Sequence, residues 1–138
     1  MPTSADLLLD TSAALALIHD MNPAHEQVRL RTKDLRLGLA GHAAFETYSV
    51  LTRMPGAARV TPARAVEIIE RAFPSSVALS SAAALSAVRT LSEAGISGGA
   101  VYDGLVGLAA READIPLVTC DRRAIGTYAA LQVDAHVV

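Results

Sequence analysis

Short apolar runs that lead into an acidic residue constrain the fold of this chain more than any other feature. Leu7-Leu8-Leu9 ends at Asp10, and the compact run 115–119 is followed closely by Asp121. Apolar runs of this length, interspersed with helical patterns, are typical of strands buried in a parallel sheet. Ligands of such sheets bind outside the carboxyl ends of the strands. The two acids are therefore predicted on the same edge of one sheet.

Helical patterns occupy the intervals between the apolar runs. Helices are predicted over roughly 11–19, 23–33 with Pro23 at the helix start, 42–53, 61–73, 81–94 and 99–113. Further short strands are predicted at 35–39, 76–79 and 133–138, the last as an edge strand. Strands that alternate with helices indicate the α/β class with a mostly parallel sheet. The 138 residues suit a single domain, 1–138, with one core.

Composition argues against several other classes of protein. No apolar run reaches the roughly 18 residues of a membrane span, and the N-terminal stretch lacks the basic region of a secretory signal. The one cysteine, Cys120, cannot form an internal disulfide, so a cytoplasmic location is expected and no membrane partner. The net charge of −2 argues against a generally basic surface for nucleic acid, although it leaves a nucleic-acid enzyme open.

A single carboxylate interrupts the apolar segment GGAVYDGLVGLAA, residues 98–110. Asp103 lies near the start of the predicted helix, where an acid can serve as a simple cap. It also borders the apolar stripe, and a carboxylate there is unfavourable unless a positive charge faces it. The glycines Gly98, Gly99 and Gly104 leave the backbone bare and would let a bulky ligand approach. The segment has no phosphate-binding glycine motif.

Glu46 is the only acid of the predicted helix 42–53, and the strand before that helix places its start on the same edge as Asp10 and Asp121. Four carboxylates that converge would repel each other and raise each other's pKa values. A divalent cation removes this repulsion, and a site made only of carboxylates suits Mg²⁺ or Mn²⁺ rather than zinc. The residues therefore predict a metal site, with an ordinary surface glutamate as the simpler alternative for Glu46.

Together these segments resemble the PIN-domain ribonucleases, and most closely the VapC toxins of bacterial toxin-antitoxin pairs. The matching stretches are LLLDTSAALAL, AFETYSVLTR, GGAVYDGLVGLAA and PLVTCDRR, in the order of the family and over nearly the whole chain. The acidic quartet of the family maps onto Asp10, Glu46, Asp103 and Asp121. The resemblance implies a PIN-like three-layer sandwich whose parallel sheet has about five strands flanked by helices.

The resemblance also implies an activity and partners. It implies a Mg²⁺- or Mn²⁺-dependent endoribonuclease that acts as a toxin on a structured or translation-related RNA, forms a homodimer and binds a small VapB-like antitoxin. Small hydroxyl residues accompany the first and last acids of the family. Here Thr11 or Ser12, and Thr119, fill those places and could orient carboxylates or water. Thr11 or Ser12 could equally cap the first helix.

In the mechanism that follows, Asp10, Asp103 and Asp121 hold the metal, while Glu46 helps to hold a second ion or to deprotonate water. Attack by the activated water on a phosphodiester would leave a 5′-phosphate and a 3′-hydroxyl. Where aromatic residues commonly follow the last acid of the family, this chain has Arg122-Arg123, which could hold phosphate instead.

Several alternatives stay open at this stage. A PIN-like module without catalytic activity could bind RNA or a protein. His42 and Glu46 share a helix face, as zinc ligands can, but no third ligand has suitable spacing. Tyr102 and Tyr128 could stack on bases, with packing as the simpler role. The patterns of haloacid-dehalogenase phosphatases and of receiver domains fit poorly, because Ser12 replaces the second acid of the former and the latter needs a late lysine.

Overall fold

The computed structural model describes residues 4–138, and its centre is a parallel sheet of four short strands. The strand order is β2-β1-β3-β4, with β1 (Leu7–Leu9), β2 (Leu37–Leu39), β3 (Leu117–Thr119) and β4 (Ala135–Val137). The chain runs from β1 to β2 on one side and then returns to β3 on the other side of β1. This reversal lies between β1 and β3, at the carboxyl end of the sheet, where α/β proteins bind ligands.

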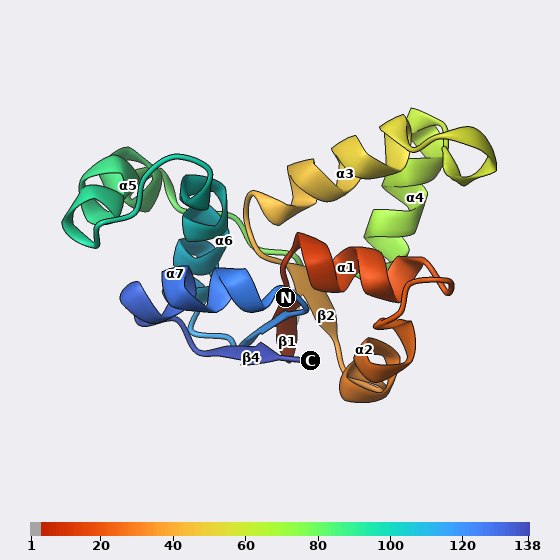
Figure 1. Cartoon of the computed structure of the whole chain (residues 1–138), viewed down its shortest axis with the longest axis horizontal. Helices are drawn as coiled ribbons and strands as arrows, with labels where there is room; N and C mark the ends of the chain where they lie inside the picture. Colours follow the sequence, from red (N-terminus) through yellow and green to blue (C-terminus); the bar gives the residue numbers. More distant parts are fainter. Residues whose placement is uncertain (1–3) are drawn as a thin grey trace.

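Within residues 4–138, seven α-helices surround the sheet (Figure 1). They are α1 (Thr11–Ile18), α2 (His25–Thr32), α3 (Ala43–Arg53), α4 (Pro62–Ala72), α5 (Ser81–Glu93), α6 (Ala100–Ala113) and α7 (Ile125–Ala130), with 3₁₀ turns η1 (Gly56–Ala58) and η2 (Arg122–Ala124). Thr61 and Ser80 cap α4 and α5, because each side chain accepts a hydrogen bond from a backbone N–H in the first turn.

The sheet is covered on both faces, as the continuous apolar runs predict. All residues of β1, β2 and β3 are buried, so helices must cover both sides of these strands and the arrangement is a three-layer α/β sandwich. The paired helices α3 and α4 extend to one side of the sheet in Figure 1, and α5 lies at the opposite end beside α6. The α/β class with a mostly parallel sheet is therefore confirmed.

Three details of the predicted elements differ from the structure. The sheet of the described residues has four strands rather than about five, because the expected strand at 76–79 is reduced to a single parallel bridge between Ala40 and Val77. The second helix begins at His25 rather than at Pro23. Residues 122–130, for which no element was predicted, form η2 and α7.

Within residues 4–138, no helix is both long and apolar enough to cross a bilayer.

Candidate active site

Asp10 follows β1 directly and caps α1. Its Oδ1 accepts hydrogen bonds from the Ala13 N–H at 3.0 Å and from the Ser12 hydroxyl at 2.7 Å. The cap is thus Asp10 itself, so the expectation that Thr11 or Ser12 caps this helix is wrong. Only 4% of Asp10 is exposed, and a buried carboxylate needs such donors to stay charged.

The third donor to Asp10 comes from the far end of the chain. The Tyr128 hydroxyl donates to Oδ2 of Asp10 at 2.8 Å, and Tyr128 is completely buried. Burial, together with the charge of Asp10, raises the pKa of the phenol well above its usual range, so Tyr128 stays protonated and always donates. Gly107 of α6 makes room for the ring, since a Cβ there would lie 3.0 Å from Cδ1 of Tyr128.

Sequence reasoning gave Tyr128 a packing role and missed this contact. Its burial agrees with packing, but its hydroxyl also holds a candidate site residue. The one available signal was Gly107, a glycine inside an apolar helix, which often marks a close approach of another element.

Asp121 lies just past β3, the neighbour of β1, and the two strand ends are joined by hydroxyl groups. The Ser12 hydroxyl accepts a hydrogen bond from the Cys120 N–H at 2.9 Å and lies 3.3 Å from the Thr119 hydroxyl. Thr119 Oγ1 in turn accepts from the Asp121 N–H at 3.0 Å. Ser12 and Thr119, which were expected to orient carboxylates, therefore connect the side chain of Asp10 to the backbone around Asp121.

Glu46 lies in the first turn of α3, and the Thr11 hydroxyl donates to its Oε1 at 3.3 Å. The start of α3 is held by Gly41, whose N–H donates to the Val77 carbonyl at 2.8 Å. Gly41 has a φ of +50°, and a Cβ there would lie 2.8 Å from the Ala109 Cβ of α6. Only glycine fits this close approach, which packs the start of α3 against the second half of α6.

Asp103 lies in the first turn of α6 without capping it. The cap position is Gly99, and no side-chain hydrogen bond to the first turn is present. The pKa of the Asp103 carboxyl is raised, first by burial and then by the negative charges of the other three acids, Asp10, Asp121 and Glu46. Four carboxylates from four separate segments thus face one region, and Asp103 feels the charge of all the others.

The four carboxylates lie near one another but do not converge on a single point. Among residues 4–138, no three His, Cys, Asp or Glu side chains are arranged as ligands of one metal ion. The zinc interpretation of His42 and Glu46 gains no third ligand in this part of the chain. Like charges in proximity repel, which opposes closer approach of the four acids.

The glycines near Asp103 divide into two groups. A Cβ on Gly104 would lie 2.5 Å from the Leu91 side chain, so this glycine lets α5 pack on α6. The expectation that Gly104 leaves room for a ligand is therefore wrong. Gly98 and Gly99 meet no atom within 4 Å of an added Cβ and leave open space beside the start of α6.

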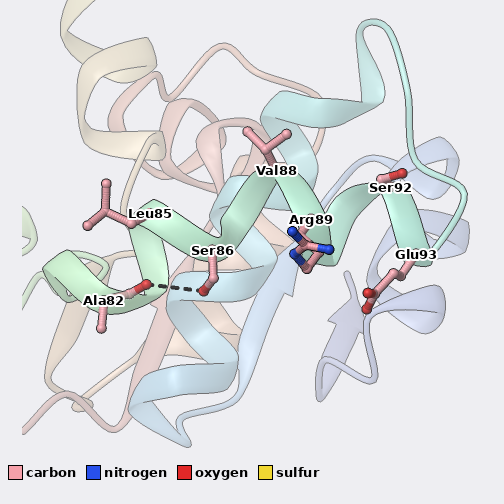
Figure 2. A pocket seen from close by; sticks show the side chains of 7 residues that line it. All are labelled: Ala82, Leu85, Ser86, Val88, Arg89, Ser92 and Glu93. Atoms are coloured by element: carbon pink, nitrogen blue, oxygen red, sulfur yellow. Dashed lines mark hydrogen bonds between the residues drawn. The ribbon is translucent and has the colours of Figure 1, made fainter.

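Two arginines border the carboxylates. Arg123 donates through its N–H and its Nε to Asp121 Oδ1, at 2.9 Å and 3.3 Å, while its side chain stays 93% exposed. Arg53 lines a pocket of about 300 Å³ along α3, together with Thr11, His42, Phe45, Glu46, Ser49 and Val50. A second exposed hollow lies along α5, and none of the four carboxylates lines it (Figure 2).

Cys120 is not a candidate nucleophile. Burial and the nearby charge of Asp10 raise the pKa of its thiol, so the reactive thiolate is disfavoured. Its side chain packs against the main core instead.

Replacement of Tyr128 with Phe should weaken the fold although the ring is retained. The change leaves one oxygen of the buried Asp10 carboxylate without its donor, which should reduce the free energy of unfolding by about 2 kcal/mol. Denaturant unfolding measures this difference. Tyr48→Phe is the matched control, because Tyr48 is 37% exposed and its loss of a hydroxyl should change stability by less than about 0.5 kcal/mol. Equal stabilities for both variants would show that the bond to Asp10 contributes nothing.

The chain is similar to proteins of known family. The PIN domain family profile matches residues 7–130. Ribonuclease VapC27 of Mycobacterium tuberculosis is 42% identical over 132 residues, covering 96% of this chain and 95% of that protein. Ribonuclease VapC40 of the same species is 36% identical over 135 residues, covering 94% and 96%.

The fold has a counterpart among solved structures. The crystal structure of PAE2754 from Pyrobaculum aerophilum superposes with a TM-score of 0.59 at 23% identity, over 99% of this chain and 92% of that one. This likeness concerns the fold alone. The family profile and the two relatives confirm the resemblance noted in the sequence: the chain belongs to the PIN domain family, as a VapC-type member.

Proposed function

We propose that this protein is an endoribonuclease that hydrolyses RNA with a divalent metal ion held by Asp10, Asp103 and Asp121. The observation that carries the proposal is the set of hydrogen bonds that groups three acids: Ser12 and Thr119 link Asp10 to Asp121, and Thr11, next to Asp10, donates to Glu46. After burial, the charges of these three acids raise the pKa of Asp103. The cluster lies at the strand-order reversal of a parallel sheet, where α/β proteins bind ligands. The names of the two relatives, both ribonucleases, support the same activity.

The donor set fits Mg²⁺ or Mn²⁺. Every candidate ligand is a carboxylate oxygen, which is the chemistry that these hard ions prefer. The repulsion that raises the pKa of Asp103 is also the energy that a bound cation would offset. When bound, such an ion lowers the pKa of water and offsets charge on a phosphodiester.

The protein's own groups would position the reactants. Glu46, whose Oε1 accepts a hydrogen bond from the Thr11 hydroxyl, would accept a proton from the attacking water. Asp10 is fixed by its three donors and cannot swing away, so it serves as the rigid member of the cluster. Arg123 is exposed beside Asp121 and can contact an RNA phosphate, which supports the phosphate role expected for the arginine pair.

We further propose that this ribonuclease acts as the toxin of a type II toxin-antitoxin pair in the cytoplasm. The support is membership in the VapC type, which implies a VapB-like antitoxin, a structured or translation-related RNA as target, and a homodimer. Met21, in the turn before α2, and Leu30, in the last turn of α2, are 90% and 60% exposed and are candidate contacts for an antitoxin segment.

Inducible expression in a bacterium tests both parts of this proposal. The wild-type chain should arrest growth and generate a small set of new RNA 5′-phosphate ends. Glu46→Gln should lose both effects, because the amide cannot accept a proton from water. Glu70→Gln, an exposed position on α4, should behave as the wild type. The measurements are growth and transcriptome-wide mapping of 5′-phosphate ends.

Two outcomes would contradict the proposal. New ends that carry a 2′,3′-cyclic phosphate would require the ribose hydroxyl as nucleophile and exclude attack by water. Growth arrest that persists in Glu46→Gln without any new ends would favour the second candidate, a PIN-like module that acts by binding RNA or protein.

A further inference from the structure

Three aromatic side chains lie directly beside the carboxylates. Phe45 precedes Glu46 in α3, Tyr102 precedes Asp103 in α6, and His42 lies at the start of α3 between them. The His42 ring stacks on Tyr102 with centroids 5.3 Å apart and meets the edge of Phe45 at 5.9 Å. We call these three residues the aromatic platform.

Two of the three rings are more exposed than aromatic side chains usually are in a folded protein. Phe45 is 71% exposed and Tyr102 is 53% exposed, although one face of Tyr102 lies against His42. The expectation that Tyr102 packs in the core or at its rim is therefore wrong. Exposed aromatic rings that are grouped together mark an interaction site more often than single exposed apolar residues do.

The platform separates two hollows of different character. On one side is the pocket of about 300 Å³ that Glu46 and Arg53 line together with His42 and Phe45. On the other side is a mostly apolar pocket of about 520 Å³, which His42 and Phe45 also line. A ligand on the platform would thus touch flat apolar surface while its charged part reached Glu46 and Arg53.

We propose that the aromatic platform stacks an unpaired base of the RNA next to the phosphate that is cleaved. This inference rests on the proposed function, since it adds a base-stacking surface to that site. Flat rings stack on any base, whereas the faces of paired bases are covered by their neighbours in a helix. Arg53, which has no ion-pair partner among residues 4–138, is placed to hold a phosphate of the same strand.

An RNA strand explains this surface better than a protein segment does. His42 and Phe45 line both hollows, so the rings lie between the apolar surface of one and the Glu46 carboxylate of the other. A nucleotide combines an apolar base with an anionic backbone and so matches both parts, provided that a cation or Arg53 meets the phosphate.

Binding of matched probes, without cleavage, tests the platform. Fluorescence anisotropy in EDTA would compare a labelled short oligoadenylate with an abasic strand of the same sugars and phosphates. Wild type should bind the oligoadenylate about tenfold more tightly, because stacking acts only on the base-bearing strand. Phe45→Ala and Tyr102→Ala should each remove most of this difference and leave abasic binding unchanged, whereas Tyr102→Phe should keep it.

Val88→Ala is the control variant, because Val88 is 78% exposed on the hollow of α5 (Figure 2) and its replacement should not affect the binding of either probe.

Equal affinities of the wild type for the two probes, including no binding to either, would overturn the proposal that the platform stacks a base. This result is expected if the true ligand of the platform is a protein segment. RNA cleavage by the same protein preparations, measured separately in Mg²⁺, keeps the two proposals apart. Base-dependent binding without any cleavage would remove the ribonuclease alone, and cleavage without base-dependent binding would remove the platform alone.

Discussion

Asp103→Asn should abolish RNA cleavage and at the same time stabilise the protein in the absence of a divalent ion. Loss of a group that only orients a metal ligand typically reduces metal affinity or activity by 10–100-fold, so loss of a ligand itself should reduce cleavage by about a thousandfold or more. No hydrogen bond to Asp103 is broken by this change among residues 4–138, and Asn has the same shape. Cleavage of total RNA in Mg²⁺, with EDTA as the zero-activity reference, measures the first effect.

The stabilising effect follows from the pKa of Asp103. The folded state raises the pKa of Asp103, so folding disfavours the charged carboxylate. The stabilisation that protonated Asp103 gives the folded state is therefore complete only at a pH below the pKa of Asp103 in the unfolded chain. That contribution is lost as pH rises through the raised pKa. Without metal, the melting temperature of the wild type should therefore fall below that of Asp103→Asn as pH rises from the acid range to neutrality.

Mg²⁺ should reverse this order. A cation that binds the carboxylates of the folded state stabilises it by mass action, so Mg²⁺ should raise the melting temperature of the wild type and barely that of Asp103→Asn. Asp114→Asn is the matched control on the same helix, because Asp114 ends α6 with a φ of 57°, where Asn is well tolerated. The metal site would be contradicted if Mg²⁺ left the melting temperature of the wild type unchanged, or if Asp103→Asn cleaved RNA at the wild-type rate.

Gly38→Ala should cause the largest loss of stability of any single methyl group added to the fold. A Cβ on Gly38 would lie 2.1 Å from the carbonyl oxygen of Ser75 and 2.8 Å from the Ser76 nitrogen, and neither is the end of a flexible side chain. Relief requires the backbone to move, so we expect a loss of about 3 kcal/mol in the free energy of unfolding. Denaturant unfolding measures it.

The same substitution should also impair the site from a distance. The segment that Gly38 contacts includes Val77, whose carbonyl accepts the Gly41 N–H at the start of α3. Displacement of this segment would move α3 and with it Glu46. Gly126→Ala is the control, because nothing lies within 4 Å of its added Cβ in α7 and the change should stabilise by about 0.5–1 kcal/mol. Equal effects of the two substitutions would refute this account.

The sequence alone determined which strands form the buried sheet and where two acids lie on it. Short apolar runs set between helical patterns predict strands covered on both sides, and parallel strands end at one edge. Asp10 and Asp121 could be placed at that edge because each follows such a run closely. This local reasoning was weaker for 76–79, where the pairing proved to be a single bridge beside Ala40.

Only the tertiary structure decided what surrounds those acids. Tyr128 donates to a carboxylate 118 residues earlier in the chain, and no local period or spacing encodes such a contact. Gly104 and Gly107 look alike in the sequence, but each makes room for a different partner, Leu91 and Tyr128. The periodicity of apolar residues indicates which side of a helix or strand is buried, because side-chain direction along an element is fixed by sequence spacing. The partner of a buried side chain depends on how whole elements pack, and the close packing of the interior fixes that choice only once the fold has formed.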